Sequence, residues 1–454
     1  SAGGHDLQLS GVEDLVGGIS DDTFAFDDGA ALPGVANSID GKSGSDTLDY
    51  SAYTTSVYVN LVGGVATGVT NGVSSIEKVI GSFTASNDIY GDNNANIFVI
   101  TSTGINNIYG RGGNDSYIFD TDSPLGTTTI FEDAAHSGSG IDTVSFAPTS
   151  TLGVTLDLSS AAAQTVNVNL ILTLVGTIEN LIGGSQNDIL TGNSSANQIT
   201  GGPGNDLLNG QAGSDTYIFA AGWGTDSVTD VSGFDTFDFS TVTSNLSFKF
   251  GASVGCTAIC VSDASNQVTV AANSIENFIG GSGDDRFEFQ HAFILGGTLN
   301  GLSGSDTLDL RAYTTSRAIS LTSIGSVDGY AGGESAVISA GFNNIEVIYG
   351  RAASNDDITG LALDSHWRID SAASTYTQDG SGRTLTFHSF ENINGLSGAD
   401  HLTLAAGAQS ANLRTGAGND TVAFEDSATL TGLINGQGGY DTLDWRLYTS
   451  GISI

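Results

Sequence analysis

The sequence contains no methionine, only two cysteines and only four prolines among its 454 residues. Because methionine is absent even at position one, we expect the chain to be a processed product or a piece of something longer. Cys256 and Cys260 are too few for a disulfide framework, and they either form one local disulfide or remain free thiols. A zinc site is not expected, because two ligands do not close a tetrahedral site and no histidine lies near them in the sequence.

Basic residues are also scarce, with 12 Lys and Arg against 50 Asp and Glu, which gives a formal net charge of -38. Such a charge disfavours nucleic acid and anionic membranes as partners. No apolar run is long enough to insert into a bilayer, and no signal peptide stands at the start of the sequence. Hydrophobic residues still make up 39% of the chain, which is too apolar for a disordered acidic segment. We therefore expect counterions to be part of the fold.

No sustained helical period occurs in the sequence, whereas alternation of β-forming residues is common, as in Val57–Leu61 and Val166–Leu170. The near absence of proline leaves few positions that would interrupt a strand ladder. The sequence therefore predicts an all-β protein.

Four nine-residue units follow one another without a break, and they begin at Gly183, Gly192, Gly201 and Gly210. Their sixth and eighth positions are occupied, in order, by Asp188 and Leu190, Asn197 and Ile199, Asp206 and Leu208, and Asp215 and Tyr217. This is the nonapeptide G-G-x-G-x-D-x-U-x of parallel β-helix repeats.

The spacing predicts a coil in which six glycine-rich residues form a tight turn and three residues form a short strand with its apolar side chain inward. Two units close one coil, so Asp188 is expected to stack under Asp206 and Asn197 under Asp215. Stacked carboxylates repel each other unless a cation lies between them, and oxygen-rich turns suit a hard ion such as Ca²⁺.

In these residues the sequence resembles the repeat-in-toxin family, whose hemolysin-type calcium-binding repeats form a parallel β-roll. The resemblance implies that sixth-position aspartates and turn carbonyls ligate calcium between neighbouring turns, and that the protein is exported before it folds. The motif is specific but covers a small part of the chain. The expected fold is a parallel β-roll or β-solenoid with β-rich insertions.

Further turns along the chain combine an acidic sixth position with an apolar eighth position. The complete set of predicted metal ligands is Asp22, Asp46, Asp115, Asp188, Asn197, Asp206, Asp215, Asp285, Asp306, Asp400, Asp420 and Asp441. The eighth positions that follow the eleven aspartates are Phe24, Leu48, Tyr117, Leu190, Leu208, Tyr217, Phe287, Leu308, Leu402, Val422 and Leu443. Stacked neighbours support Asp188, Asp206 and Asp215, whereas Asp22, Asp285 and Asp400 are interpreted as isolated turns.

A larger module overlies these repeats. It begins with GKSGSDTLDYSAYTTS from Gly41, GLSGSDTLDLRAYTTS from Gly301 or a weaker copy, as around Asp142 and Asp235. Some thirty to forty residues later a second signature follows, as in SSIEKVIGS from Ser74. The irregular module lengths favour a solenoid with insertions. The predicted boundaries are 1–40 (second half of a module), 41–137, 138–230 with the four tandem units, 231–300, 301–435 and 436–454 (first half).

Because both ends of the sequence fall within a module, we expect either excision from a longer surface protein or head-to-tail self-association, which yields open filaments when the rotation does not close.

Aromatic pairs such as Tyr117 with Phe119 and Tyr217 with Phe219 could form a sugar-stacking surface, but residues two apart in a strand share a face and are more often core.

No H-E-x-x-H or G-x-S-x-G motif in a suitable setting occurs, and the six histidines are scattered, so we expect no enzyme activity. The expected function is that of an extracellular or cell-surface, calcium-binding structural protein, in a rigid surface, sheath or filament element of bacterial origin. One alternative is an adhesin segment that grips cell-surface glycans with insertions at 235–273 or 306–343. The other is the non-catalytic, calcium-binding region of a secreted polysaccharide-active enzyme.

Overall fold

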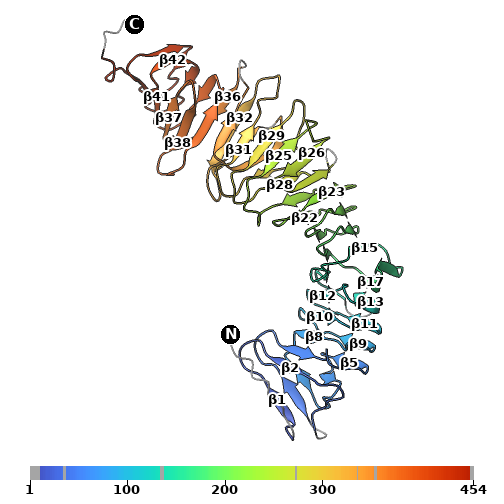
Figure 1. The fold of residues 1–454 in the computed structure, drawn as a ribbon. Helices are drawn as coiled ribbons and strands as arrows, with labels where there is room; N and C mark the ends of the chain where they lie inside the picture. The colour runs from blue at the N-terminus through green and yellow to red at the C-terminus, as the bar shows by residue number, and fades with distance from the viewer. Residues whose placement is uncertain are drawn as a thin grey trace. The chain divides into compact units, whose positions relative to one another are not determined.

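The computed structural model describes residues 11–33, 37–132, 138–270, 274–334, 336–351 and 355–449. Within these ranges all regular secondary structure is β, with strands of two to eight residues joined by turns. The predicted all-β class and parallel solenoid are confirmed (Figure 1). None of the described segments forms a helix that could cross a membrane. The outer ends of the two predicted half-modules, residues 1–10 and 450–454, lie outside the described residues, as does Asn273.

The chain divides into two compact units. The first contains Ser1–Asp215 and Asp230–Ser232, and the second contains Thr216–Thr229 and Gly233–Ile454. The predicted module boundaries concern sequence repeats and stay a prediction.

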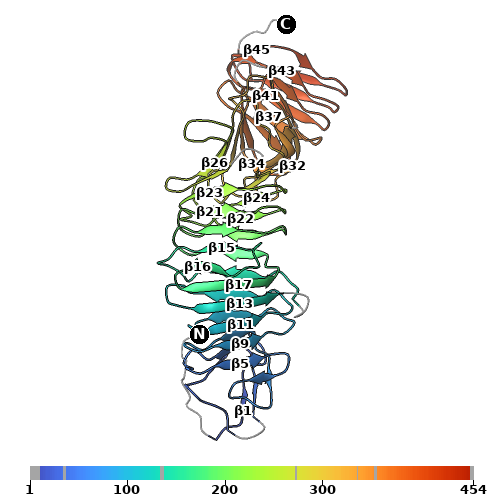
Figure 2. The same cartoon turned by 90° about the vertical axis from the view of Figure 1, so that its right-hand side faces the viewer.

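In the first unit the chain alternates between two parallel sheets. Figure 2 shows strands of one of them stacked in order from β5 to β17. One sheet contains, in order, β2 (Thr23–Ala25), β4 (Thr47–Asp49), β8 (Lys78–Ile80), β10 (Ile97–Ile100), β12 (Ser116–Phe119), β14 (Thr143–Ser145), β18 (Asn180–Ile182) and β20 (Gln198–Thr200). The facing strands are β5 (Val57–Asn60), β9 (Asn87–Tyr90), β11 (Ile105–Tyr109), β13 (Gly126–Glu132) and β17 (Leu170–Gly176), followed by β15 (Thr155–Asp157), β19 (Ile189–Thr191) and β21 (Leu207–Asn209).

Strand register confirms the predicted recurrence in the tandem units. Leu190 pairs with Leu208 between β19 and β21, and Leu181 pairs with Ile199 between β18 and β20. Both pairs are eighteen residues apart, which is the length of two nonapeptides. Each coil therefore places its inward apolar residue directly on that of the preceding coil.

The second unit continues the same architecture but replaces single strands by antiparallel meanders at three places. The meanders are β25 (Ser247–Phe250), β26 (Ile259–Ser262) and β27 (Gln267–Val270); β32 (Ala318–Ile324), β33 (Tyr330–Glu334) and β34 (Ile338–Ile345); and β37 (Ser365–Ile369), β38 (Ser374–Gln378) and β39 (Leu385–His388). The outer strands of each meander pair in parallel with neighbouring coils, as β25 does with β29 (Arg286–Phe289). The insertions therefore add strands to the sheets and keep the parallel pairing of the coils on either side.

The interior contains the predicted apolar partners. Nine of the eleven eighth-position residues are buried, while Phe24 is half-buried and Leu443 is exposed. Tyr117, Phe119, Tyr217 and Phe219 are fully buried, so their interpretation as core is confirmed.

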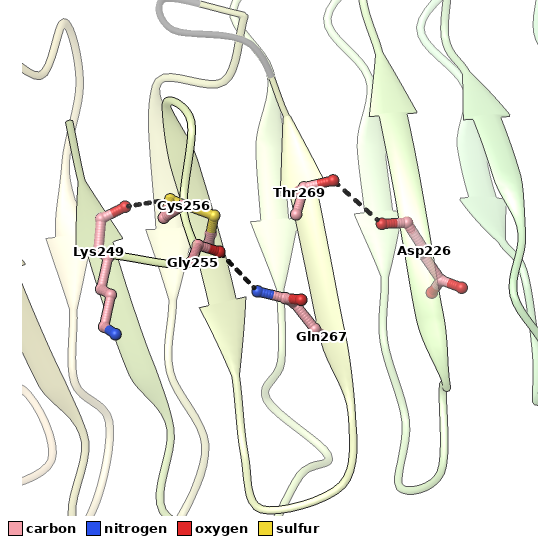
Figure 3. Close-up of a disulfide and its surroundings, with 7 residues drawn as sticks. Asp226, Lys249, Gly255, Cys256, Gln267 and Thr269 are labelled. Atoms are coloured by element: carbon pink, nitrogen blue, oxygen red, sulfur yellow. Dashed lines mark hydrogen bonds between the residues drawn. A yellow bond between two sulfur atoms is a disulfide. The ribbon is translucent and has the colours of Figure 1, made fainter. Parts of the chain in front are cut away.

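The two cysteines form a disulfide, so the free-thiol alternative is wrong. Cys256 and Cys260 close the loop between β25 and β26, close to the carbonyl oxygen of Lys249 (Figure 3). Nearby, the Gln267 side chain donates a hydrogen bond to the Gly255 carbonyl over 3.5 Å. The disulfide therefore lies within the first meander.

Candidate metal sites

The acidic turns of the tandem units stack as predicted. The amide of Asp188 donates to Oδ1 of Asp206 over 2.9 Å, and the amide of Asn197 donates to Oδ1 of Asp215 over 2.7 Å. The second oxygen of Asp188 accepts the amide of Gly184 in its own turn. All four sixth-position side chains are buried, so their oxygens face the inside of the turns.

The same arrangement extends to turns outside the tandem units, and the interpretation of three aspartates as isolated turns is wrong. The amides of Asp22, Asp285 and Asp400 donate to Oδ1 of the next aspartate in the stack over 2.8, 2.8 and 2.9 Å, respectively. Their acceptors are Asp46, Asp306 and Asp420. These stacks could not be found by an eighteen-residue period, because the partners lie 24, 21 and 20 residues apart.

The remaining predicted ligands also belong to stacks. Asp115 accepts the amide of Asn96 over 2.7 Å, and Asp441 accepts that of Asp420 over 3.2 Å. Asp441 is exposed and Asp22 is half-buried, whereas the other ten predicted ligands are buried. The structure therefore brings all twelve into acidic stacks, and their role as metal ligands stays a prediction.

Sequence reasoning missed a set of glutamates that takes the place of an aspartate in the stack. The Ile-Glu pair of the second signature, or Phe-Glu in its last copy, brings a carboxylate under the preceding acidic turn, where it accepts the aspartate amide over 2.6–3.0 Å. The pairs are Asp46 with Glu77, Asp142 with Glu179, Asp235 with Glu276, Asp306 with Glu346, and Asp356 with Glu391. The fixed glutamate of this signature is the signal that could have identified them, together with Asp142, Asp235 and Asp356.

The reverse hydrogen bonds fix the geometry of these pairs. The carbonyl of Asp142 accepts the amides of both Glu179 and Asn180, and the carbonyl of Asp306 likewise accepts those of Glu346 and Val347. Each glutamate is therefore held by backbone and side chain together, which keeps the acidic stack continuous where further strands separate the two turns in the sequence.

The first glycine of the repeat lies where oxygens from two turns converge. A Cβ atom at Gly183 would lie less than 3.0 Å from both the Asp188 carboxylate and the Gly201 carbonyl oxygen. At Gly301 the same clash would involve the Asp306 carboxylate and the Asn344 carbonyl. Only glycine leaves room for this group of oxygens.

Burial makes the stacked carboxylates costly to ionise. It raises the pKa of Asp188 to about 6, and burial together with the nearby charge of Asp188 raises the pKa of Asp206 to about 7. In the second unit, burial and the neighbouring acids raise the pKa of Asp306 to about 7. The Oδ2 atoms of Asp46 and Asp306 are buried and receive no hydrogen bond from the described part of the chain.

These features fit a hard divalent cation. Buried anionic oxygens without a donor are unfavourable unless a positive charge compensates them. Carboxylate and carbonyl oxygens are the ligands that Ca²⁺ prefers, and its coordination tolerates irregular geometry. In the tandem units Asp188, Asp206 and the adjacent glycine carbonyls would hold such an ion.

Comparison with known families gives the same interpretation. Residues 182–217 match the RTX calcium-binding nonapeptide repeat, in four copies. These repeats bind calcium, and proteins that carry them are typically secreted. No curated protein matches the chain.

Substitution of Gly183 by alanine tests the convergence of oxygens. The added Cβ would displace the Asp188 carboxylate, so we expect calcium affinity at this turn to fall at least about tenfold, or about 1.4 kcal/mol. Calcium titration followed by circular dichroism measures the change. Gly333→Ala is the control, because a Cβ at Gly333 would meet nothing within 4 Å. Equal affinities for the two variants would contradict the assignment.

The pKa shifts predict opposite pH dependences with and without calcium. Asp188, Asp206 and Asp306 have pKa values of about 6 to 7 in the fold against 3.8 as the ordinary value. Without calcium, the stability from protonated carboxyls is therefore complete below pH about 4 and is lost as the pH rises to about 7. With saturating calcium, stability should rise over that range, because the ion binds the deprotonated groups. Urea unfolding at several pH values measures both curves, and parallel curves would count against metal binding here.

Proposed function

Since residues 182–217 belong to the RTX calcium-binding nonapeptide repeats, we propose that the protein is a calcium-stiffened structural element outside the cell, in a bacterial surface layer, sheath or filament. The observation that supports this most is the spread of the acidic stacks. They run from Asp22 to Asp441 and are not confined to the four matched repeats. Calcium binding would then stiffen each unit along its whole length, which is the property of a mechanical element.

The charge balance supports calcium as a folding switch. A chain with a net charge of -38 that buries carboxylates in stacks is opposed by its own repulsion until cations are bound. Extracellular calcium-binding modules bind with weak affinities of about 10⁻⁴–10⁻³ M. The chain would remain unfolded where calcium is scarce and fold after export, since metal-binding free energy becomes folding free energy.

We include head-to-tail self-association in this proposal. At the last described coil Leu443 is 47% exposed, whereas its partner Val422 in the preceding coil is 3% exposed. A further coil stacked on β47 (Thr442–Asp444) would bury Leu443 and shield Asp441. A second copy that supplied this coil would make a heterologous contact, which extends into a filament.

Two observations favour a structural role over the adhesin alternative. The insertions at 235–273 and 306–343 contain meanders that continue the sheets. In addition, the partly exposed aromatic rings that form a row on the outer face of the first unit stack on one another. The rings of Tyr90 and Tyr109 are stacked 4.2 Å apart, and Tyr109 and Phe131 are 4.3 Å apart, so each ring covers the face of the next. A sugar needs an uncovered face.

Removal of calcium tests the proposed function. A chelator should abolish most of the β signal in circular dichroism, and added Ca²⁺ should restore it, whereas Mg²⁺ at the same concentration should not. Electron microscopy of the refolded protein should show rods joined end to end.

A spectrum that is indifferent to the chelator would contradict the calcium-dependent fold. Folded single rods that bind a glycan array would instead support the adhesin alternative. A catalytic domain in the complete reading frame would favour the other alternative, in which the chain is the non-catalytic region of a polysaccharide-active enzyme.

A further inference from the structure

Three carboxylates meet inside the first unit, well before the matched repeats. Asp115 precedes β12, Asp142 precedes β14, and Glu132 is the last residue of β13 in the facing sheet. One oxygen from each lies within 4.8 Å of the others, and all three side chains are buried. Thr128, Ile130 and Glu132 alternate inward along β13, so Glu132 occupies a core position.

Neighbouring groups hold one oxygen of each carboxylate and leave others free. Oδ1 of Asp115 accepts the amide of Asn96, and Oδ1 of Asp142 accepts the amide of Asp115 over 2.8 Å. The Tyr117 hydroxyl donates to Oε1 of Glu132. Within the described residues, Oδ2 of Asp115 and Oε2 of Glu132 receive no hydrogen bond. These side chains are only 1% and 6% exposed, so solvent does not satisfy the free oxygens.

The electrostatic environment adds no compensating charge. The influences on the three carboxyls come from burial, from hydrogen bonds and from other acids, and no Lys or Arg of the described chain contributes. Burial raises the pKa of Glu132 to about 8 and that of Asp115 to about 7. A cation would remove the cost of ionising this cluster.

We propose that Asp115, Glu132 and Asp142 form an interior calcium site in which a glutamate from the facing sheet completes an acidic stack. The three oxygens lie within 4.8 Å of one another, and this limit is about twice the Ca²⁺–oxygen distance of about 2.4 Å, so all three can reach one ion. Mg²⁺ fits less well, because it retains several waters and these three side chains are buried. The site rests on the proposed calcium-dependent function and adds a ligand that the nonapeptide pattern does not contain.

The glycine turn beside the site is shaped for the same oxygens. A Cβ atom at Gly110 would lie less than 3.0 Å from the Glu132 and Asp115 carboxylates and from the Tyr117 hydroxyl. Three oxygen-bearing groups therefore converge on one bare backbone position, as the turn glycines do elsewhere.

The sequence contains a second copy of the underlying pattern. The segment NDSYIF with Asp115 corresponds to SDTYIF with Asp215, and each is followed by a Gly-Thr strand with an acid six residues after its glycine. That acid is Glu132 in the first copy and Asp230 in the second. Burial, with a smaller contribution from the charge of Asp230, raises the pKa of Asp215 to about 6. The repetition indicates that the acid after the strand is a regular part of this turn and not a chance feature of one copy.

The variant Glu132→Gln in the full chain tests the site. It keeps the shape of the side chain but removes the charge, so we expect one fewer tightly bound Ca²⁺ per chain in equilibrium dialysis with radioactive calcium. Glu288→Gln, at an outward-facing position of β29, is the matched control and should bind as many ions as the wild type. Circular dichroism in saturating calcium establishes that both variants fold.

Terbium luminescence gives an independent measurement if Glu132→Gln does not fold. Terbium bound beside Tyr117 would be excited by that phenol, so Tyr117→Phe should lose part of the tyrosine-sensitised emission while binding the same number of ions. Wild-type binding in Glu132→Gln, or full emission in Tyr117→Phe, would overturn this site alone. A wild-type protein that binds no calcium would instead overturn the proposed function.

Discussion

The burial of stacked carboxylates is the constraint on which the rest of the structure depends. A solenoid of short strands repeats its side chains along its length, so an acid in one turn lies directly on an acid in the next. Backbone amides donate to at least one oxygen of these carboxylates, as the amide of Asp188 does to Oδ1 of Asp206. Several of the second oxygens, such as Oδ2 of Asp306 and Asp420, have no donor within the described chain. The first glycines of the repeat leave the space that these oxygens share.

Two stacks of side chains, one apolar and one acidic, run through this architecture. Apolar and aromatic side chains fill the interior between the sheets, while carboxylates occupy the corners. The module glutamates connect the corners across insertions, since Glu346 lies 40 residues after Asp306 and still accepts its amide. The meanders can therefore lengthen a sheet without interrupting the acidic stack. Both stacks of side chains should contribute to stability, but only the acidic stack responds to calcium and pH.

The tandem repeats were predictable because a strict nine-residue period gives the register directly, as the pairing of Leu190 with Leu208 confirms. The stacks of Asp285 and Asp400 were missed because their partners lie at other spacings, which depend on loop lengths that a period cannot reveal. The module glutamates carried a sequence signal, the repeated Ile-Glu, whose meaning required the fold. Glu132 carried a weaker signal, an acid six residues after the glycine of a Gly-Thr strand, and its inward direction became visible only from the alternation along β13.

The most direct test of the account is a crystal structure grown in calcium, with anomalous scattering used to locate the ions. Calcium bound in the stacked turns should give anomalous peaks between the turns of Asp188 and Asp206, within reach of both carboxylates and the adjacent glycine carbonyls. If these positions hold only water or protonated carboxyls in crystals saturated with calcium, calcium binding by the stacked turns is contradicted.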